Sequence, residues 1–117
     1  MPHTSKARNV RTSAKERWVS IEGPITAATA TNFEKSLAKL AQKSAEPIVV
    51  FLKSPGGYSI SCLKIYFLIT DLIKKRTPVH TVGVNTVQSG AFVILQAGAR
   101  RFATKSTLFL FHGTVRI

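Results

Sequence analysis

Ser89 is the residue of this sequence best suited to nucleophilic chemistry. It precedes Gly90 and lies between a β-branched segment, residues 79–84, and an apolar segment, residues 92–95, that is typical of a buried helix. A serine at a strand-to-helix junction can project its hydroxyl into a cleft while the first free N–H groups of the helix point at the same place. Most serines in this position only cap the helix, so a catalytic interpretation needs partners elsewhere in the chain.

His112 and three glycines are the candidate partners. A hydroxyl becomes nucleophilic when a base takes its proton, and neutral imidazole suits that task near neutral pH. Gly56, Gly57 and Gly90 would let the backbone approach an oxyanion closely, although proline followed by glycines is also a common turn composition. A histidine at a strand end can equally be satisfied locally. No group of His, Cys and acid has metal-ligand spacing, so we expect no metal and no cofactor.

The elements that must position these residues follow from the apolar pattern. Strands are predicted at residues 18–21, 48–52, 79–84 and 108–111, and helices at residues 31–45, 58–75 and 89–98. The order β-α-β-α-β-α-β predicts an α/β fold with a mainly parallel sheet. Ligands of such sheets bind beyond the carboxyl ends of the strands, and the Pro-Gly-Gly turn, Ser89 and His112 all follow strands. We therefore expect them at one edge.

Local details of these elements are also predicted. Thr31 and Glu34 fit a capping box that would begin the first helix. The uninterrupted apolar run 48–52 predicts a strand buried on both faces. The second helix is expected to direct four apolar residues toward the core, namely Ile60, Leu63, Phe67 and Ile69.

Composition limits the classes of function. The 117 residues suit one domain, and the net charge of +12 predicts attraction to nucleic acid, acidic membrane surfaces or acidic proteins. We expect a basic mobile arm over residues 1–17 and a folded domain over 18–117. A solvated tail is favoured, and an organelle transit peptide is one alternative because the start is basic and poor in acids. A nucleic-acid-binding arm is another, although it lacks interleaved aromatic stacking residues. The row Lys35, Lys39 and Lys43 is interpreted as a solvated surface, with a ligand site as the alternative. No membrane-length apolar segment and no signal peptide occur, so a cytoplasmic location is expected.

Several motifs together resemble the proteolytic subunit of the Clp protease, a member of the ClpP/crotonase fold. They are Ser54-Pro55-Gly56-Gly57, Ser89 with Gly90-Ala91-Phe92 after it, residues 97–103, and Phe111-His112. The resemblance covers about residues 18–112. It implies Ser89 as nucleophile, His112 as general base, Gly57 and Gly90 as oxyanion donors, and substrate contacts along Gly56, Tyr58 and Ser59. It also implies a peptide or unfolded-protein substrate, a homo-oligomer or mixed ring, and an ATP-dependent unfoldase partner.

The sequence departs from that family at two places. Gln88 precedes the serine, and a shift of one residue would put Gln88 in the nucleophile's place; counting back from residues 97–99 without a gap favours Ser89. The family's orienting aspartate and ring-stacking handle helix lie beyond the histidine, whereas no acid follows Asp71 here. A C-terminally truncated serine peptidase domain with weak or absent activity is therefore expected, since loss of the acid can cost about ten-thousand-fold in rate.

Two other functions remain open. One is that of a non-catalytic ClpP-like subunit or scaffold in a mixed ring. A crotonase-type acyl-CoA enzyme would share the fold, but it usually needs a catalytic acid, which the sequence does not offer near Ser89.

Overall fold

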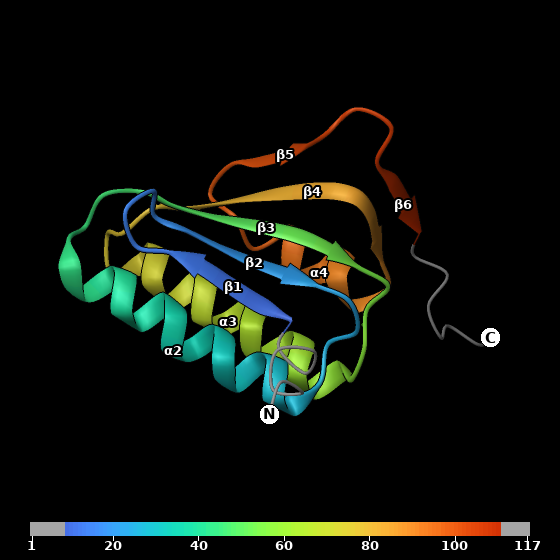
Figure 1. Ribbon diagram of the computed structural model, residues 1–117, viewed down its shortest axis with the longest axis horizontal. Coiled ribbons are helices and arrows are strands. Elements are labelled where there is room, and N and C mark those ends of the chain that lie inside the picture. Colours follow the sequence, from blue (N-terminus) through green and yellow to red (C-terminus); the bar gives the residue numbers. More distant parts are fainter. Residues whose placement is uncertain (1–8, 111–117) are drawn as a thin grey trace, which may run out of the picture.

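A single mixed sheet carries the fold, with helices packed against one of its faces (Figure 1). The computed structural model describes residues 9–110. Its elements are β1 (Val10–Ser13), β2 (Trp18–Glu22), α2 (Ala27–Lys43), β3 (Ile48–Ser54), α3 (Ser59–Lys74), β4 (Val79–Gln88), α4 (Gly90–Leu95), β5 (Arg101–Ala103) and β6 (Leu108–Leu110). The strand order is β1-β2-β3-β4-β5, and β6 pairs with β4. Only the β1–β2 pair is antiparallel among these strands, so the predicted α/β fold with a mainly parallel sheet is confirmed.

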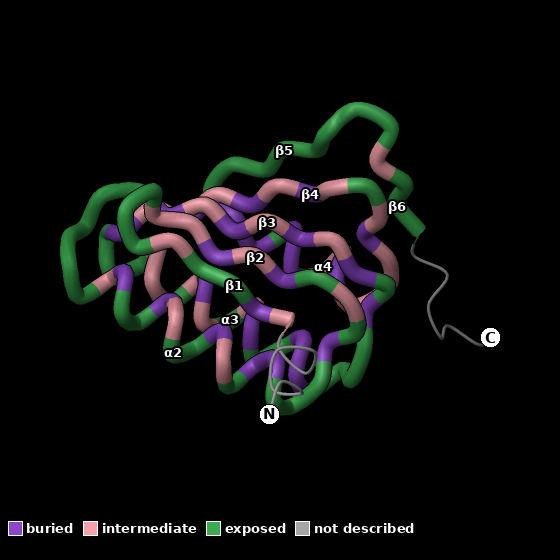
Figure 2. The backbone as a smooth tube through the Cα atoms, viewed as in Figure 1, coloured by how far each residue is buried: buried purple, intermediate pink, exposed green. Residues whose placement is uncertain are grey.

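The sheet is covered on one face rather than two. In β3, Ile48, Val50 and Leu52 are fully buried, whereas the alternate residues Val49 and Phe51 are half-buried. The same alternation of buried and half-buried residues runs along β4 from Val79 to Val84 and is interrupted by the exposed Asn85 (Figure 2). The expectation that residues 48–52 are buried on both faces is therefore wrong, because α2, α3 and α4 all contribute their buried residues to the same core.

Helix α2 begins four residues before the predicted start. Its N-cap is Thr26, whose hydroxyl accepts a hydrogen bond from the Thr29 N–H at 3.2 Å, while the Thr26 N–H donates to the Thr29 hydroxyl at 3.0 Å. The capping box is thus formed by Thr26 and Thr29, and the prediction of Thr31 and Glu34 is wrong. The earlier start adds a turn that buries Thr29 and Ala30 ahead of the predicted core residue Phe33.

Helix α3 occupies the predicted residues, but a different side of it packs against the core. Ile69 is buried as expected, whereas Ile60, Leu63 and Phe67 are 78%, 44% and 59% exposed. The core face is formed instead by Ser61, Cys62, Ile65 and Ile69. This helix carries apolar residues on both sides, so periodicity alone did not identify which side meets the sheet.

Part of the predicted basic arm belongs to the sheet. Residues 10–13 form β1, which pairs with β2 in the register Val10 to Ile21, and Val10 is 5% exposed. The expected boundary between arm and domain is therefore wrong from Val10 onward, and residues 1–8 lie outside the described part. Arg17 anchors the following turn by donating to four carbonyl oxygens near the end of α2, those of Leu40, Ser44, Glu46 and Pro47.

The last two strands both pair with β4. The short strand β5, which was not predicted, lies beside Thr81 to Gly83, and β6 lies beside Thr86 to Gln88. Phe109 of β6 packs edge-on against Phe92 of α4, with ring centroids 6.1 Å apart. This contact holds β6 next to the junction between β4 and α4.

Candidate active site

Ser89 occupies a sharp turn between β4 and α4. Its backbone has φ 54° and ψ −123°, a combination that L residues rarely adopt. The Ser89 N–H donates to the Leu110 carbonyl of β6 at 2.7 Å, and the Ser89 carbonyl accepts from the Phe92 N–H at 2.9 Å. A strained serine between a strand and a helix is the arrangement that nucleophile elbows use to expose the hydroxyl. The Ser89 residue is half-buried, so its side chain is not sealed in the core.

Gln88 does not share this conformation. It is the last residue of β4, and its side-chain amide donates to the Thr86 hydroxyl at 2.7 Å. No positive φ occurs at Gln88, whereas Ser89 carries one. The elbow therefore lies at Ser89, which removes the structural basis for shifting the nucleophile's place by one residue.

The turn after β3 lies against this elbow. Gly56 has φ 100°, and a Cβ added there would be 3.0 Å from the Ser89 Cβ and 3.1 Å from the Gly90 nitrogen. The buried Ser54 hydroxyl accepts a hydrogen bond from the Gly56 N–H at 3.0 Å and so shapes the turn. Sequence reasoning gave Ser54 no role; its place two residues before Gly56 is the signal of a serine turn.

Gly57 and Gly90 meet at the thiol of Cys62. A Cβ on Gly90 would lie 2.5 Å from the Cys62 sulfur, so only glycine fits there without movement. Burial raises the pKa of the Cys62 thiol, and a hydrogen bond from the Gly57 backbone acts in the opposite direction. Cys62 is 2% exposed and packs as a small buried residue. Its position beneath both glycines was not foreseen, because it depends on how α3 and α4 pack.

The predicted substrate residues lie at the start of α3. Gly56 is buried, and its carbonyl accepts from the Ile25 N–H at 3.0 Å. Tyr58 is 68% exposed and donates its N–H to the Ile25 carbonyl at 3.0 Å, and Ser59 is also exposed. Tyr58 and Ser59 are thus accessible, whereas Gly56 acts within the turn.

The predicted base, His112, lies outside the described residues. His80 lies in β4, nine residues before Ser89 at the opposite end of the strand, so it is no substitute. Its Nδ1 is buried without a hydrogen-bond partner among the described residues. Asp71 forms an ion pair with Lys75 at 3.1 Å on the exposed side of α3.

Residues 9–110 contain no group of three His, Cys, Asp or Glu side chains arranged to hold a metal ion. Among the helices of that same segment, none combines the length and apolarity needed to cross a membrane.

Comparison with known proteins assigns the family. The Clp protease family profile matches residues 3–117. The chain is 33% identical over 108 residues to the ATP-dependent Clp protease proteolytic subunit of Paracoccus denitrificans, covering 90% of this chain and 52% of that protein. It is 29% identical to the ATP-dependent Clp protease proteolytic subunit 2 of Treponema denticola, covering 82% and 48% respectively.

Solved structures agree with this family. ClpP1 from Listeria monocytogenes aligns with TM-score 0.73 and 30% identity, over 91% of this chain and 58% of that one. A point mutant of the same protein aligns with TM-score 0.76 and 30% identity, over 85% and 57%. The chain therefore belongs to the Clp protease family and has the ClpP fold. It spans about half the length of the curated relatives it matches.

Proposed function

We propose that this chain is a serine peptidase domain of the Clp type, in which Ser89 attacks the peptide carbonyl. The observation that carries this proposal is the backbone of Ser89, with φ 54° and ψ −123° at the end of β4. Such strain persists only where the surrounding structure enforces it, and it clusters at functional sites. Here the enforcing contacts are the Leu110 carbonyl on one side and the Gly56 turn on the other.

His112 supplies the general base in this proposal. It follows Leu110 by two residues, and a chain extends at most about 3.6 Å per residue. Because the Leu110 carbonyl accepts a hydrogen bond from the Ser89 N–H, the last residue of β6 lies next to Ser89. His112 is therefore only two residues away from a residue that contacts the elbow. The imidazole takes the Ser89 proton during attack and returns it to the leaving amine.

Backbone N–H groups of Gly57 and Gly90 stabilise the oxyanion of the tetrahedral intermediate, with the Gly57 N–H exchanging its bond to the Cys62 thiol for one to the oxyanion. The close approach of Gly56 to Gly90 supports this assignment, because the turn that contains Gly57 lies against the elbow at Ser89. Removal of one such donor typically costs about 10²–10³-fold in rate. The substrate is a peptide or unfolded protein whose extended chain lies along the exposed residues Tyr58 and Ser59.

A fluorophosphonate probe tests the nucleophile. We expect the full chain to be labelled and the adduct to map to Ser89, with Ser89→Ala unlabelled. Ser44→Ala is the matched control, because Ser44 is exposed at the end of α2, away from the elbow, and should leave labelling unchanged. A folded protein whose label maps to another serine, or which remains unlabelled both alone and with a full-length relative, would contradict the peptidase.

A non-catalytic ring subunit is the second candidate, favoured by the exposed apolar side of α3. Ile60, Leu63 and Phe67 are 78%, 44% and 59% exposed. Contiguous apolar surface of this kind marks interaction sites. In either role the chain assembles through this side into a homo-oligomer or mixed ring, and an ATP-dependent unfoldase delivers the substrate.

Light scattering tests the assembly, with and without a full-length relative. Ile60→Glu combined with Phe67→Glu should reduce the assembled mass, whereas Lys105→Glu, which changes the charge equally at an exposed site between β5 and β6, should leave it unchanged. A monomer in every mixture would contradict assembly while leaving the labelling result at Ser89 unaffected.

A further inference from the structure

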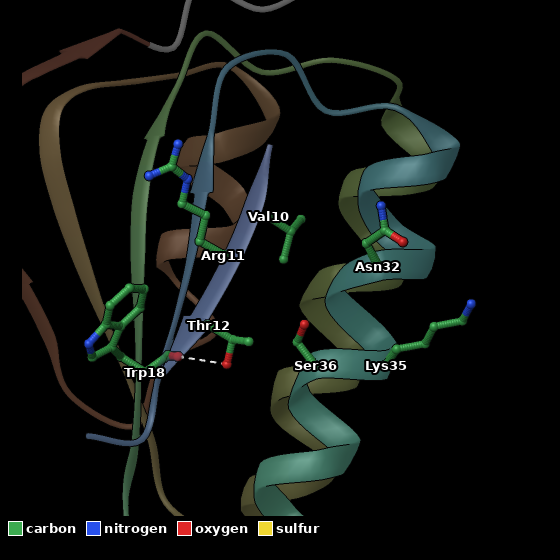
Figure 3. A pocket seen from close by; sticks show the side chains of 7 residues that line it. All are labelled: Val10, Arg11, Thr12, Trp18, Asn32, Lys35 and Ser36. Atoms are coloured by element: carbon green, nitrogen blue, oxygen red, sulfur yellow. Dashed lines mark hydrogen bonds between the residues drawn. The ribbon is translucent and has the colours of Figure 1, made fainter. Parts of the chain in front are cut away.

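A groove runs between the free edge of β1 and the outer side of α2 (Figure 3). It consists of two neighbouring hollows of about 530 and 510 Å³ that share Thr12 and Ser36 in their walls. Figure 3 shows Val10 and Thr12 on the strand side, facing Asn32 and Ser36 on the helix side. The groove is separate from the elbow at Ser89, which lies across the sheet at the end of β4.

The strand wall of this groove offers unpaired backbone groups. β1 is the first strand in the sheet order, so one of its edges has no partner strand among residues 9–110. The Glu22 N–H donates to the Asn9 carbonyl at 3.0 Å, and these residues are opposite each other in the β1–β2 register. Hydrogen-bonded pairs alternate along antiparallel strands, so Arg11 and Ser13 also bond β2. The N–H and C=O groups of Val10 and Thr12 therefore face the open edge.

The helix wall carries an uncompensated row of positive charge. Lys35 lines the first hollow, and Lys39 and Lys43 line the second. All three are exposed, and none takes part in the ion pairs formed within residues 9–110. α2 has no acidic residue in its first turn, and its one glutamate, Glu34, pairs with Lys64 of α3. The groove therefore favours an anionic occupant.

The spacing of the lysines matches an extended peptide. Residues four apart on a helix are separated by about 6 Å along its axis. Alternate residues of a strand are separated by about 6.7 Å along the strand. α2 runs alongside β1, as Figures 1 and 3 show. We propose that an acidic peptide adds to the edge of β1 as a further strand and sets alternate carboxylates against Lys35, Lys39 and Lys43. Main-chain hydrogen bonds provide affinity in such β-augmentation, and the alternate side chains provide specificity.

Other occupants fit the groove less well. A second copy of this chain pairing through β1 would bring Arg11 and the lysine row against the same positive residues, which like-charge repulsion disfavours. A single-stranded nucleic acid would match the charge but would leave the edge of β1 unpaired. It would also require aromatic stacking surfaces, and Trp18 is engaged edge-on with Phe51, with ring centroids 6.0 Å apart.

Fluorescence anisotropy with the full chain and a labelled eight-residue peptide of alternating Glu and Val tests the proposal. We expect saturable binding that weakens as NaCl is raised from 50 to 300 mM. Lys35→Glu with Lys39→Glu should weaken binding about tenfold, because two attractive charge contacts become repulsive. The matched control is Lys74→Glu with Lys105→Glu, which changes the net charge equally at exposed sites away from the groove and should change affinity less than twofold.

The strand-addition step has its own test. Thr12→Pro removes an N–H that faces the open edge, where edge strands tolerate proline, and also the hydroxyl that donates to the Trp18 carbonyl at 3.0 Å. Thr12→Ala removes that hydroxyl alone and is therefore the matched control. We expect Thr12→Pro to weaken binding about tenfold and Thr12→Ala to retain it, since each lost backbone hydrogen bond also disturbs its neighbours. N-methylation of alternate peptide residues should weaken binding similarly and requires no change in the protein.

Four results would overturn the proposal. One is the absence of binding at 50 mM NaCl; another is equal affinity for a peptide with its four Glu and four Val in separate blocks. The third is an oligothymidylate of eight nucleotides binding at least as tightly and remaining insensitive to Thr12→Pro, which would assign the groove to nucleic acid. A doubling of mass on light scattering without peptide that persists in Ile60→Glu with Phe67→Glu and is lost in Thr12→Pro would instead assign the groove to a second copy.

Discussion

Replacing Ser89 by glycine should stabilise the protein, although it removes the proposed nucleophile. At φ 54° and ψ −123° a side chain with a Cβ is strained, and such strain costs about 1–3 kcal/mol. Glycine relieves it but loses more backbone entropy on folding, which costs roughly 0.5–1 kcal/mol. Ser89→Gly should therefore unfold with a free energy about 1 kcal/mol higher than Ser89→Ala, which keeps the Cβ and lacks only the hydroxyl.

Urea denaturation of the two variants measures this difference. Both must be compared at one protein concentration, because assembly would add a concentration-dependent stabilisation. Asn85→Gly is a useful control: Asn85 also has a positive φ of 68°, but asparagine tolerates that region, so a gain of only about a few tenths of a kcal/mol is expected. Equal or lower stability of Ser89→Gly relative to Ser89→Ala would refute the claim that the elbow is strained.

Three further perturbations follow from the packing around the site. Gly90→Ala should destabilise the protein by about 1–3 kcal/mol, because its Cβ would lie 2.5 Å from the Cys62 sulfur, and adding Cys62→Ala should recover most of that loss in a double-mutant cycle of urea midpoints. Arg17→Ala should cost about 2–3 kcal/mol by leaving the carbonyls at the end of α2 without their donors, and Arg17→Lys should rescue little, since one ammonium cannot reach four acceptors at once. Burial raises the pKa of the Cys62 thiol, so the native state holds that proton more tightly than the unfolded chain; the free energy of unfolding should fall as the pH rises above about 8.5, and this fall should be smaller in Cys62→Ala measured over the same pH range.

The alternation of strands and helices was predictable from the sequence where segments are strongly apolar and end at proline or glycine. The strand that became β3 is followed by Pro55, and the helix that became α3 ends before Pro78. β1 was missed because it contains one buried apolar residue, Val10, and its stability comes from pairing with β2 rather than from its own pattern. Local sequence carries little information on such pairing.

The helix errors have a different origin. The threonines at 26, 29 and 31 offer several plausible caps, and the one used is fixed by contacts from outside the helix: the Thr29 hydroxyl also donates to the Asn9 side chain at 3.0 Å. Both sides of α3 are apolar enough to pack into a core. The side with Cys62 and Ile65 is buried, whereas Ile60 and Phe67 are exposed.

Some features of the candidate site were likewise predictable from the sequence, and others were not. Ser89 and the glycine turn were predictable as residues that follow strands. The strain at Ser89 and the thiol beneath Gly90 were not, because each depends on contacts between separate elements. The hydrogen bond from Gly56 to Ser54 is local, and the serine two residues before Gly56 was its signal in the sequence. The role of His112 stays a prediction.

The hydrogen bond between the Ser89 amide and the Leu110 carbonyl makes the conformation of the elbow depend on β6. β6 contributes three residues, all exposed, so its detachment from β4 requires only a small opening free energy compared with global unfolding. Whenever β6 detaches, the amide loses its acceptor and the tightest bend in the fold loses one of its restraints. The shape of the turn at Ser89 is thus set by the fraction of time that this short, weakly held strand spends docked.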